Sequence, residues 1–278
     1  MSSCSRKIVE TNAERTAQYR KRVDEMSIMD DAFMTVALDD NTTLGEILSI
    51  ILDRKINVIS VESQVTVSNL EGRGVRLDIL GEDEERKFYN LEVQRGKDGA
   101  YPARLVLNAG AALLHCTPKG VDYSDIPEVY VILIYQGDYF GDGLPVYNFE
   151  FELKASNVEE NINFHVHLYY VNGAYEGANT KIEQLVHDLS CPNPDKIHNE
   201  VIAARVKTVK TVESEVIKVY RNLDKEYQEG WNDGRDEERL ANIRSLMKRK
   251  GFELEETLDI LGIPKKEWDR YRSLLDTK

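Results

Sequence analysis

The chain has 278 residues, of which 41% are hydrophobic and 31% are charged, and its formal net charge is -13. This length suits one domain of moderate size with an appendage, or two small domains, and the composition excludes a disordered chain. The negative charge argues against a protein that coats nucleic acid by bulk attraction, but not against an enzyme whose local groove is basic or whose bound metal ions supply positive charge.

The first residues are helical in composition and carry no targeting signal. Residues 1–31 are expected to form an N-terminal helical arm, with six basic residues between positions 6 and 22. They lack the apolar core of a secretory signal, and the chain has no run of 18 apolar residues, so we expect no membrane association. The three cysteines, Cys4, Cys116 and Cys191, are widely spaced and fit no zinc motif, which favours reduced thiols in the cytoplasm.

The segment TTLGEILSIILD, residues 42–53, predicts an amphipathic helix. Thr43 is the expected N-cap, and Glu46 stands three residues later, at the position of a capping-box acid. An acid on this helix is also a candidate metal ligand, so Glu46 has two alternative interpretations.

Strand and helix signals alternate from residue 58 to residue 191. Alternating or continuous apolar patterns predict strands, and longer periodic segments predict helices. The expected strands are 58–70, 74–80, 87–94, 128–136, 145–154 and 163–173, and the expected helices are 101–116 and 181–191. This order predicts a mixed α/β domain over residues 32–204, with one central sheet flanked by helices.

Strand signals end near residue 199, and residues 205–278 are expected to form a helical C-terminal region. The pattern predicts a helix over 200–231, a second over 233–251, and two short helices separated at Gly262-Ile263-Pro264. The last two helices resemble a helix-turn-helix, but acidic residues dilute their basic charge. A pair that binds a partner or another copy of the chain is therefore the favoured interpretation.

Two neighbouring predicted strands carry acids, although a strand buried in a protein core is expected to be apolar. Since side chains alternate across a strand, Asp78 on one strand and Glu92 and Gln94 on the next fall on the same side when the apolar faces are matched. Two carboxylates pressed together repel, and a divalent cation such as Mg²⁺ or Mn²⁺ relieves that repulsion. A plain solvated face is the alternative interpretation of the same pattern.

Several further segments match a known group of proteins, in the same order along the chain. These are DAFMTVALDD, ILDRKINVISVESQVTVSNLEGRGVRLDIL, YNLEVQRG, YFGDGLPVYNFEFEL, YVNGAYEG and HDLSCPNPDKIHNE. On these motifs the chain resembles the PD-(D/E)XK nuclease superfamily, specifically the PD-(D/E)XK nuclease family transposases, in the branch of Rpn-type recombination-promoting nucleases. The resemblance implies a restriction-endonuclease-like core and a metal-dependent DNA endonuclease linked to mobile elements or recombination.

The resemblance also implies roles for individual residues. Asp78 and Glu92 match the two acids that bind the metal ion, and the carbonyl of Val93 matches a further ligand. Gln94 stands where the superfamily most often has a lysine, and it would orient the attacking water. Glu46 matches the extra acid that some members use.

The expected contacts to DNA are less complete than in the family. Three arginines near the predicted site are candidates to bind phosphates, namely Arg76, Arg95 and Arg104. Other positions of the same helix, where the resemblance implies arginines or an aromatic residue, hold Ala103, Val106 and Leu107. Their identity favours an alternative function, a catalytically degraded relative that acts as a binding or regulatory module.

Overall fold

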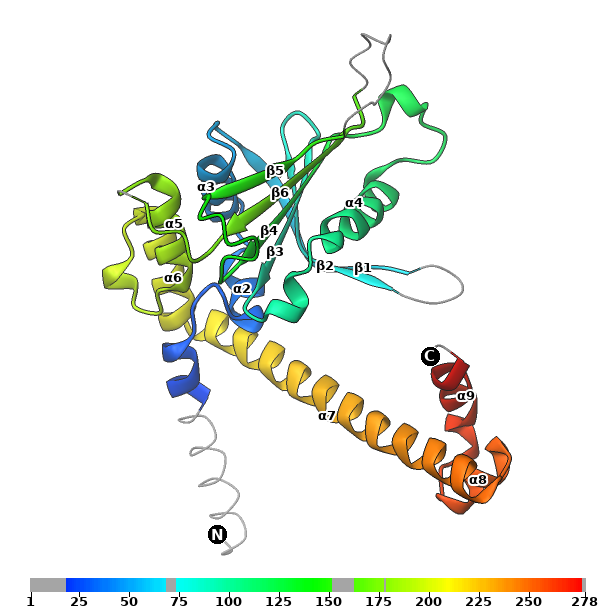
Figure 1. Cartoon of the computed structure of the whole chain (residues 1–278). Coiled ribbons are helices and arrows are strands. Elements are labelled where there is room, and N and C mark those ends of the chain that lie inside the picture. The colour runs from blue at the N-terminus through cyan, green and yellow to red at the C-terminus, as the bar shows by residue number, and fades with distance from the viewer. Residues whose placement is uncertain (1–18, 69–73, 152–162, 178, 277–278) are drawn as a thin grey trace, which may run out of the picture. The chain divides into compact units, whose positions relative to one another are not determined.

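The computed structural model describes residues 19–68, 74–151, 163–177 and 179–276, which fall into two compact units, Met1–Tyr220 and Arg221–Lys278. The first unit contains a mixed six-stranded sheet flanked by helices, and a helical region follows it (Figure 1). This confirms the predicted restriction-endonuclease-like fold class. The predicted boundary between residues 204 and 205 falls within helix α6, Glu200–Thr211.

The sheet has the strand order β1-β2-β3-β4-β6-β5. Its strands are β1 Val58–Val67, β2 Val75–Asp83, β3 Phe88–Gln94, β4 Val129–Tyr135, β5 Val146–Phe149 and β6 Val166–Asn172. The first three form an antiparallel meander, β3, β4 and β6 run parallel, and β5 is an antiparallel edge strand. The central strand β4 is buried from Val129 to Ile134, as its continuous apolar sequence predicts for a strand covered on both faces.

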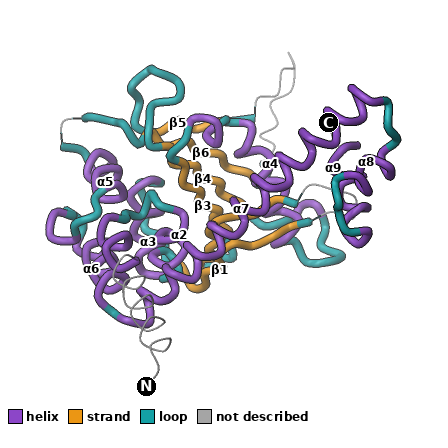
Figure 2. The backbone as a smooth tube through the Cα atoms, turned by 90° about the horizontal axis from the view of Figure 1, so that it is seen from below, coloured by secondary structure: helices purple, strands orange, loops and turns teal. Residues whose placement is uncertain are grey.

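Helices cover both faces of this sheet (Figures 1 and 2). The α-helices of this part of the chain are α2 Asp31–Ala37, α3 Asn41–Ile51, α4 Ala103–Cys116, α5 Lys181–Ser190 and α6 Glu200–Thr211. Short 3-10 turns occur at η1 Lys97–Ala100, η2 Tyr123–Asp125 and η3 Pro194–Lys196. Helix α4 packs on one face, where its Leu105, Ala109 and Ala112 join a core with strand residues such as Val131 and Leu133.

Helix α3 begins earlier than the sequence pattern predicts. Its N-cap is Asp40, whose Oδ2 accepts hydrogen bonds from the backbone N of Thr43 at 2.8 Å and from its Oγ1 at 2.7 Å. The assignment of Thr43 as the N-cap is therefore wrong, because the carboxylate three residues earlier satisfies the free N–H group that the cap must serve. Glu46 lies in the second turn and is no capping-box residue.

The break between the long C-terminal helices also differs from the prediction. Helix α6 ends at Thr211, Val212 is extended with φ -81° and ψ 119°, and α7 Glu213–Lys250 then continues through the position where a break was expected. Residues 208–212 include four β-branched side chains, which lower helix propensity. The glycines at 230 and 234 cost only about 1 kcal/mol each, which a 38-residue helix tolerates.

The unit Arg221–Lys278 has its own small core of Ile243, Leu258, Ile263 and Tyr271. Besides part of α7 it contains α8 Leu254–Ile260, η4 Lys265–Glu267 and α9 Trp268–Asp276. The predicted break after α8 is confirmed, with Gly262 at φ 65°, a conformation that glycine adopts at little cost.

The described part of the expected N-terminal arm packs on the first unit. Residues 19–25 are helical, and Val23, Ile28 and Met29 are buried. Most of the basic segment, residues 6–18, lies outside the described residues. Among the residues that the structure describes, no helix is long and apolar enough to cross a membrane.

Candidate functional site

The strand pair β2–β3 places Asp78 and Glu92 next to each other under α4. Ile79 of β2 pairs with Leu91 of β3, so the next antiparallel pair in this register is Asp78 and Glu92. The backbone N of Asp78 donates a hydrogen bond of 3.0 Å to Oε1 of Glu92. Asp78 is 5% exposed and Glu92 is 0% exposed, so both acids lie inside the protein and not on a solvated face.

The carboxylate of Glu92 is surrounded by donors. Nη2 of Arg104, from the first turn of α4, lies 2.8 Å from its Oε2. The side-chain amide of Asn90, two residues earlier on β3, donates to Oε1 at 3.1 Å. Asn108, one turn after Arg104 on α4, donates to Oδ1 of Asn90 at 3.4 Å and so orients that amide. The negative charge of Glu92 is therefore compensated by a guanidinium group and by hydrogen bonds.

Asp78 has no comparable compensation. Burial, followed by repulsion from Glu92 and Asp31 and a hydrogen bond to Glu92, raises the pKa of Asp78 to about 8, and the charge of Arg104 only partly opposes this. Burial beside Glu92 therefore favours the protonated form of Asp78 when no cation is bound, and a bound cation would favour the charged form.

A cavity of about 250 Å³ opens above Asp78. It is lined by Gly74, Val75, Arg76, Asp78, Arg104, Leu107 and Asn108. Because one water occupies about 30 Å³ of liquid, the cavity has room for a hydrated cation together with a phosphate group. One acid and two arginines therefore face the same space.

The donor set fits a hard divalent cation. The carbonyl of Gln94 accepts from the backbone N of Gln136, beyond the end of β4. Since successive carbonyls of a strand point in opposite directions, that of Val93 points toward β2. Ile79 and Leu91 are the last paired residues of β2 and β3 toward the C-terminal end of β3. The carbonyl of Val93 lies beyond this pair. Two carboxylates and a carbonyl are oxygen ligands of the kind that Mg²⁺ and Mn²⁺ prefer.

Gln94 lies at the end of β3, beside the turn η1. A Cβ atom added to Gly99 would lie 2.2 Å from Oε1 of Gln94 and 3.8 Å from Nη1 of Arg104. The carboxamide is thus folded against η1, close to the guanidinium that holds Glu92. A side chain at position 99 would displace it from this position.

The candidate DNA-binding arginines all have acidic neighbours. Nη2 of Arg76 lies 3.3 Å from Oδ2 of Asp31, and Nη1 of Arg95 lies 2.8 Å from Oδ1 of Asp30. Arg76 and Arg104 line the cavity, whereas Arg95 is held at the start of α2. Sequence reasoning missed Asp31, whose signal was its place in the Asp-Asp pair that opens an apolar helix.

Glu46 lies in a different cavity. Its Oε1 accepts a hydrogen bond of 2.8 Å from the side-chain amide of Asn199, and it lines a space of about 320 Å³ with Asp188 and His198. The structure therefore brings Asp78 and Glu92 together, and Val93 and Gln94 follow Glu92 at the end of β3. Glu46 lies elsewhere.

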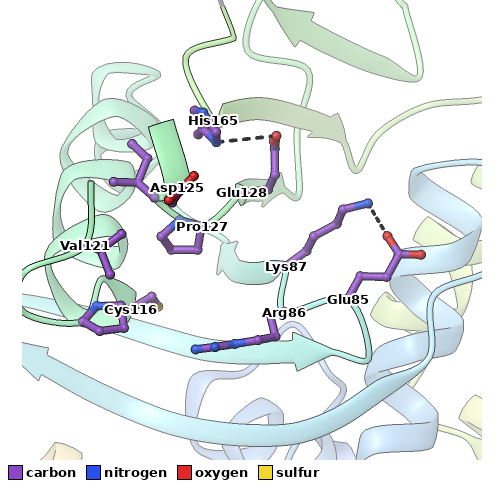
Figure 3. A pocket seen from close by; sticks show the side chains of 11 residues that line it. Glu85, Arg86, Lys87, Cys116, Val121, Asp125, Pro127, Glu128 and His165 are labelled. Carbon is purple, nitrogen blue, oxygen red and sulfur yellow. Dashed lines mark hydrogen bonds and ion pairs between the residues drawn. The ribbon is translucent and has the colours of Figure 1, made fainter. Parts of the chain in front are cut away.

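A further cavity of about 320 Å³ lies at the opposite ends of the parallel strands (Figure 3). Three of its lining residues directly precede a parallel strand: Lys87 precedes β3, Glu128 precedes β4 and His165 precedes β6. Lys87 pairs with Glu85, and Glu128 lies 3.7 Å from Nδ1 of His165. Lys87 and Glu128 are thus already engaged by neighbouring side chains. Ligands of parallel sheets bind at the other strand ends.

Comparison with known proteins gives one match. A family described as PD-(D/E)XK nuclease family transposase matches residues 36–174, which is half of the chain and includes the facing acids Asp78 and Glu92. No curated protein and no solved structure matches the chain.

Proposed function

Because the chain belongs to the PD-(D/E)XK nuclease family transposases, we propose that it is a metal-dependent endonuclease that hydrolyses phosphodiester bonds of DNA. We place it in the Rpn-type, recombination-linked branch of that family. The observation that carries the proposal is the buried pair of Asp78 and Glu92 on adjacent strands, beneath a cavity that two arginines share. Burying two facing acids in a sheet has a high electrostatic cost. A function that requires both acids would explain why they are there.

In this proposal Asp78, Glu92 and the carbonyl of Val93 hold Mg²⁺ or Mn²⁺. The ion, when bound, polarises a phosphate oxygen and lowers the pKa of a water molecule. Asp78 must lose its proton to serve as a ligand, so ion binding and deprotonation of Asp78 are coupled. The carboxylate of Glu92 is held in position by Arg104 and Asn90.

The remaining residues bind and orient the substrate. Arg104 donates to Glu92 and, at 3.5 Å, to the carbonyl of Gly99, which leaves other N–H groups of its guanidinium for a phosphate oxygen. Arg76 faces the same cavity and adds positive charge. The carboxamide of Gln94 can donate to or accept from a water molecule, and thereby orient it for in-line attack.

A second candidate function is a nuclease fold that binds DNA or a protein without cleaving it. Two observations favour it. The surface of α4 where the family resemblance implies arginines presents the exposed apolar side chains of Val106 and Leu107. Arg95, a further candidate for phosphate binding, is paired with Asp30.

The test is cleavage of supercoiled plasmid in Mg²⁺ or Mn²⁺ by the wild type, Asp78→Ala and Glu92→Ala. Glu82→Ala is the matched control. Glu82 lies four residues after Asp78 on β2, on the same face of the strand, but it does not line the cavity. We expect nicking by the wild type and the control, and none by the two site variants. Cleavage that survives both substitutions would refute the assigned ligands, and a folded but inactive wild type would favour the binding module.

We also propose that the protein acts in the cytoplasm and that its C-terminal helices bind another copy of the chain. The first point is supported by Cys116 and Cys191, which form no disulfide in the described part of the chain. Tyr227 and Trp231 support the second, since both are exposed and lie four residues apart on α7, on one side of the helix. Light scattering of the wild type and of Tyr227→Ser/Trp231→Ser checks self-association, which the substitutions should weaken.

A further inference from the structure

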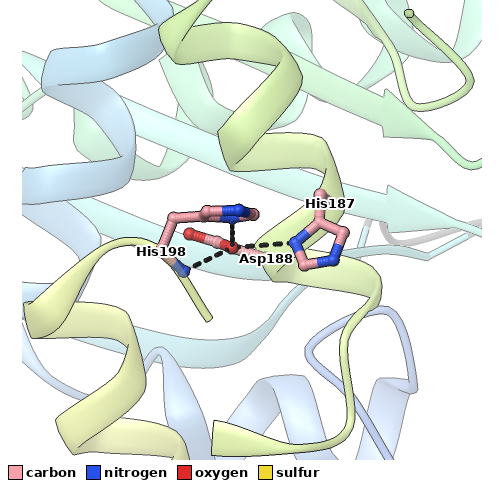
Figure 4. Close-up of side chains that lie close together, drawn as sticks. All are labelled: His187, Asp188 and His198. Atoms are coloured by element: carbon pink, nitrogen blue, oxygen red, sulfur yellow. Dashed lines mark hydrogen bonds and ion pairs between the residues drawn. The ribbon is translucent and has the colours of Figure 1, made fainter. Parts of the chain in front are cut away.

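Two histidines and an aspartate meet where α5 ends and α6 begins (Figure 4). His187 and Asp188 lie in the last turn of α5, and His198 closely precedes α6. Nδ1 of His187 is 3.0 Å from Oδ1 of Asp188, and Nδ1 of His198 is 2.8 Å from the same oxygen. Both imidazoles thus point one nitrogen at one carboxylate oxygen.

The aspartate is buried and held in place by hydrogen bonds. Asp188 is fully buried, and its two oxygens accept hydrogen bonds of 2.8 Å from the backbone N atoms of His198 and Asn199. Burial opposes its ionisation, but these bonds and those from the two imidazoles outweigh burial and lower the pKa of Asp188. A buried carboxylate that four hydrogen bonds hold in one orientation is suited to bind a cation.

The spacing of the three donor atoms suits a small metal ion. Bonds of about 2.0–2.2 Å to nitrogen and oxygen in a tetrahedral site separate neighbouring donors by about 3.3 Å. The two nitrogens lie 3.0 and 2.8 Å from the carboxylate oxygen, and all three atoms lie within 4.8 Å of one another. To reach that geometry, each imidazole nitrogen would move a few tenths of an ångström away from the carboxylate oxygen. The two imidazole nitrogens would also move closer to each other.

The two imidazoles lie at the surface. Their side chains are 49% and 51% exposed, so each ring can keep Nε2 toward water while Nδ1 binds an ion. Asp188 and His198 also border the cavity of about 320 Å³ that contains Glu46. This space offers a fourth ligand position to water, and the carboxylate of Glu46 adds negative charge beside it.

We propose that His187, Asp188 and His198 form a binding site for a divalent transition metal, with Zn²⁺ as the ion that suits it best. Imidazole and carboxylate together favour Zn²⁺, whereas Mg²⁺ prefers oxygen ligands alone. The ion would link the end of α5 to the start of α6 and hold the loop of residues 191–197 between them. The site is separate from the Asp78–Glu92 pair and does not depend on the proposed nuclease activity.

The first experiment counts bound zinc. Chelator-treated full-length protein is dialysed against Zn²⁺ in excess Mg²⁺, and the metal content per chain is measured. We expect His187→Gln/His198→Gln to bind one Zn²⁺ per chain fewer than the wild type, because glutamine keeps an N–H donor for Asp188 but replaces the imidazole ligand. His165→Gln/His167→Gln removes two imidazoles elsewhere and should bind as much zinc as the wild type.

Two further measurements keep the test decisive. Asp78→Ala should bind zinc at this site like the wild type, which separates the result from failure of the nuclease proposal. Imidazole NMR signals need no variant: of the five histidines, those of His187 and His198 should shift on addition of one equivalent of Zn²⁺. Equal zinc content in the wild type and the His187→Gln/His198→Gln protein, or histidine signals that do not respond to Zn²⁺, would overturn the proposal.

Discussion

Replacing Asp78 by asparagine should stabilise the metal-free protein at neutral pH and abolish its stabilisation by Mg²⁺. Asp78 is buried beside Glu92, and burial, followed by that charge, raises the pKa of Asp78 to about 8. Asparagine has nearly the shape of a protonated aspartate, and its amide can donate the same hydrogen bond to Glu92. It removes the cost of protonating an acid and also removes a proposed metal ligand.

The magnitude follows from the difference between the folded and unfolded chains. An unfolded aspartate has a pKa of about 3.9. Since the folded pKa of Asp78 is higher, the folded chain binds the extra proton, and stability falls as pH rises from about 4 to about 8, by at most about 1.4 kcal/mol per unit. The upper limit at pH 7 is about 4 kcal/mol, and water that enters the cavity reduces the expected gain to about 1–3 kcal/mol.

The assay is urea unfolding of the wild type and Asp78→Asn in chelator, at pH 4.5 and at pH 7.5. Both tryptophans, Trp231 and Trp268, belong to the unit Arg221–Lys278, so tyrosine circular dichroism is the better probe of the sheet. The two proteins should have nearly equal stability at pH 4.5 and differ at pH 7.5. Glu82→Gln, on the same strand, is the control and should show a much smaller gain.

Two results would refute this reasoning. If Asp78→Asn were less stable than the wild type at pH 7.5, the ionised carboxylate would be making a favourable interaction in the metal-free protein. If the gain were equal at both pH values, it would not arise from the ionisation of Asp78. Stabilisation of the variant by Mg²⁺ to the same extent as the wild type would exclude Asp78 as a metal ligand.

Three further substitutions test other parts of the structure. Arg104→Gln leaves the buried Glu92 without its cation and should cost about 2–4 kcal/mol in urea unfolding, whereas a loss below about 0.5 kcal/mol would show that the ion pair is unimportant. Lys210→Met removes a buried ammonium group that donates hydrogen bonds to three backbone carbonyls. It should lower the melting temperature by an amount equivalent to about 2–4 kcal/mol of stability. An unchanged melting temperature would contradict the observed contacts. Tyr271→Phe removes the 2.7 Å hydrogen bond to Asp236 and should destabilise the C-terminal unit by about 1–2 kcal/mol, as followed by tryptophan fluorescence; loss of sheet signal instead would argue against a separate unit.

The candidate site could be predicted in part because it depends on strand periodicity. Side chains of a strand alternate whatever the strand packs against, so the sequence places Asp78 on the face opposite its apolar neighbours, and Glu92 likewise. The same local rule predicts the buried strand β4, whose apolar residues leave no polar face. The break at Gly262 is equally local, because it depends on the conformational freedom of one residue.

Local rules fail where a side chain has alternative partners. Glu46 has the spacing of a capping-box acid, but Asp40 caps the helix, and Glu46 contacts Asn199, 153 residues away. For Arg104 the sequence offered only phosphate as a partner, and the packing of α4 on the sheet also places its guanidinium 2.8 Å from Glu92. Asp31 had no assigned role, and only the position of α2 brings its charge close enough to act on Asp78.

The sequence by itself determined the order of the elements, the faces of the strands and the residue types at the site, since these depend on neighbours a few positions away. The tertiary structure alone decided that Asp78 lies opposite Glu92, that Arg104 neutralises only one of these acids, and that His187 and His198 share one carboxylate oxygen. The physical reason is that charges and ligand atoms act through space over a few ångströms, and the packing of distant segments sets those distances.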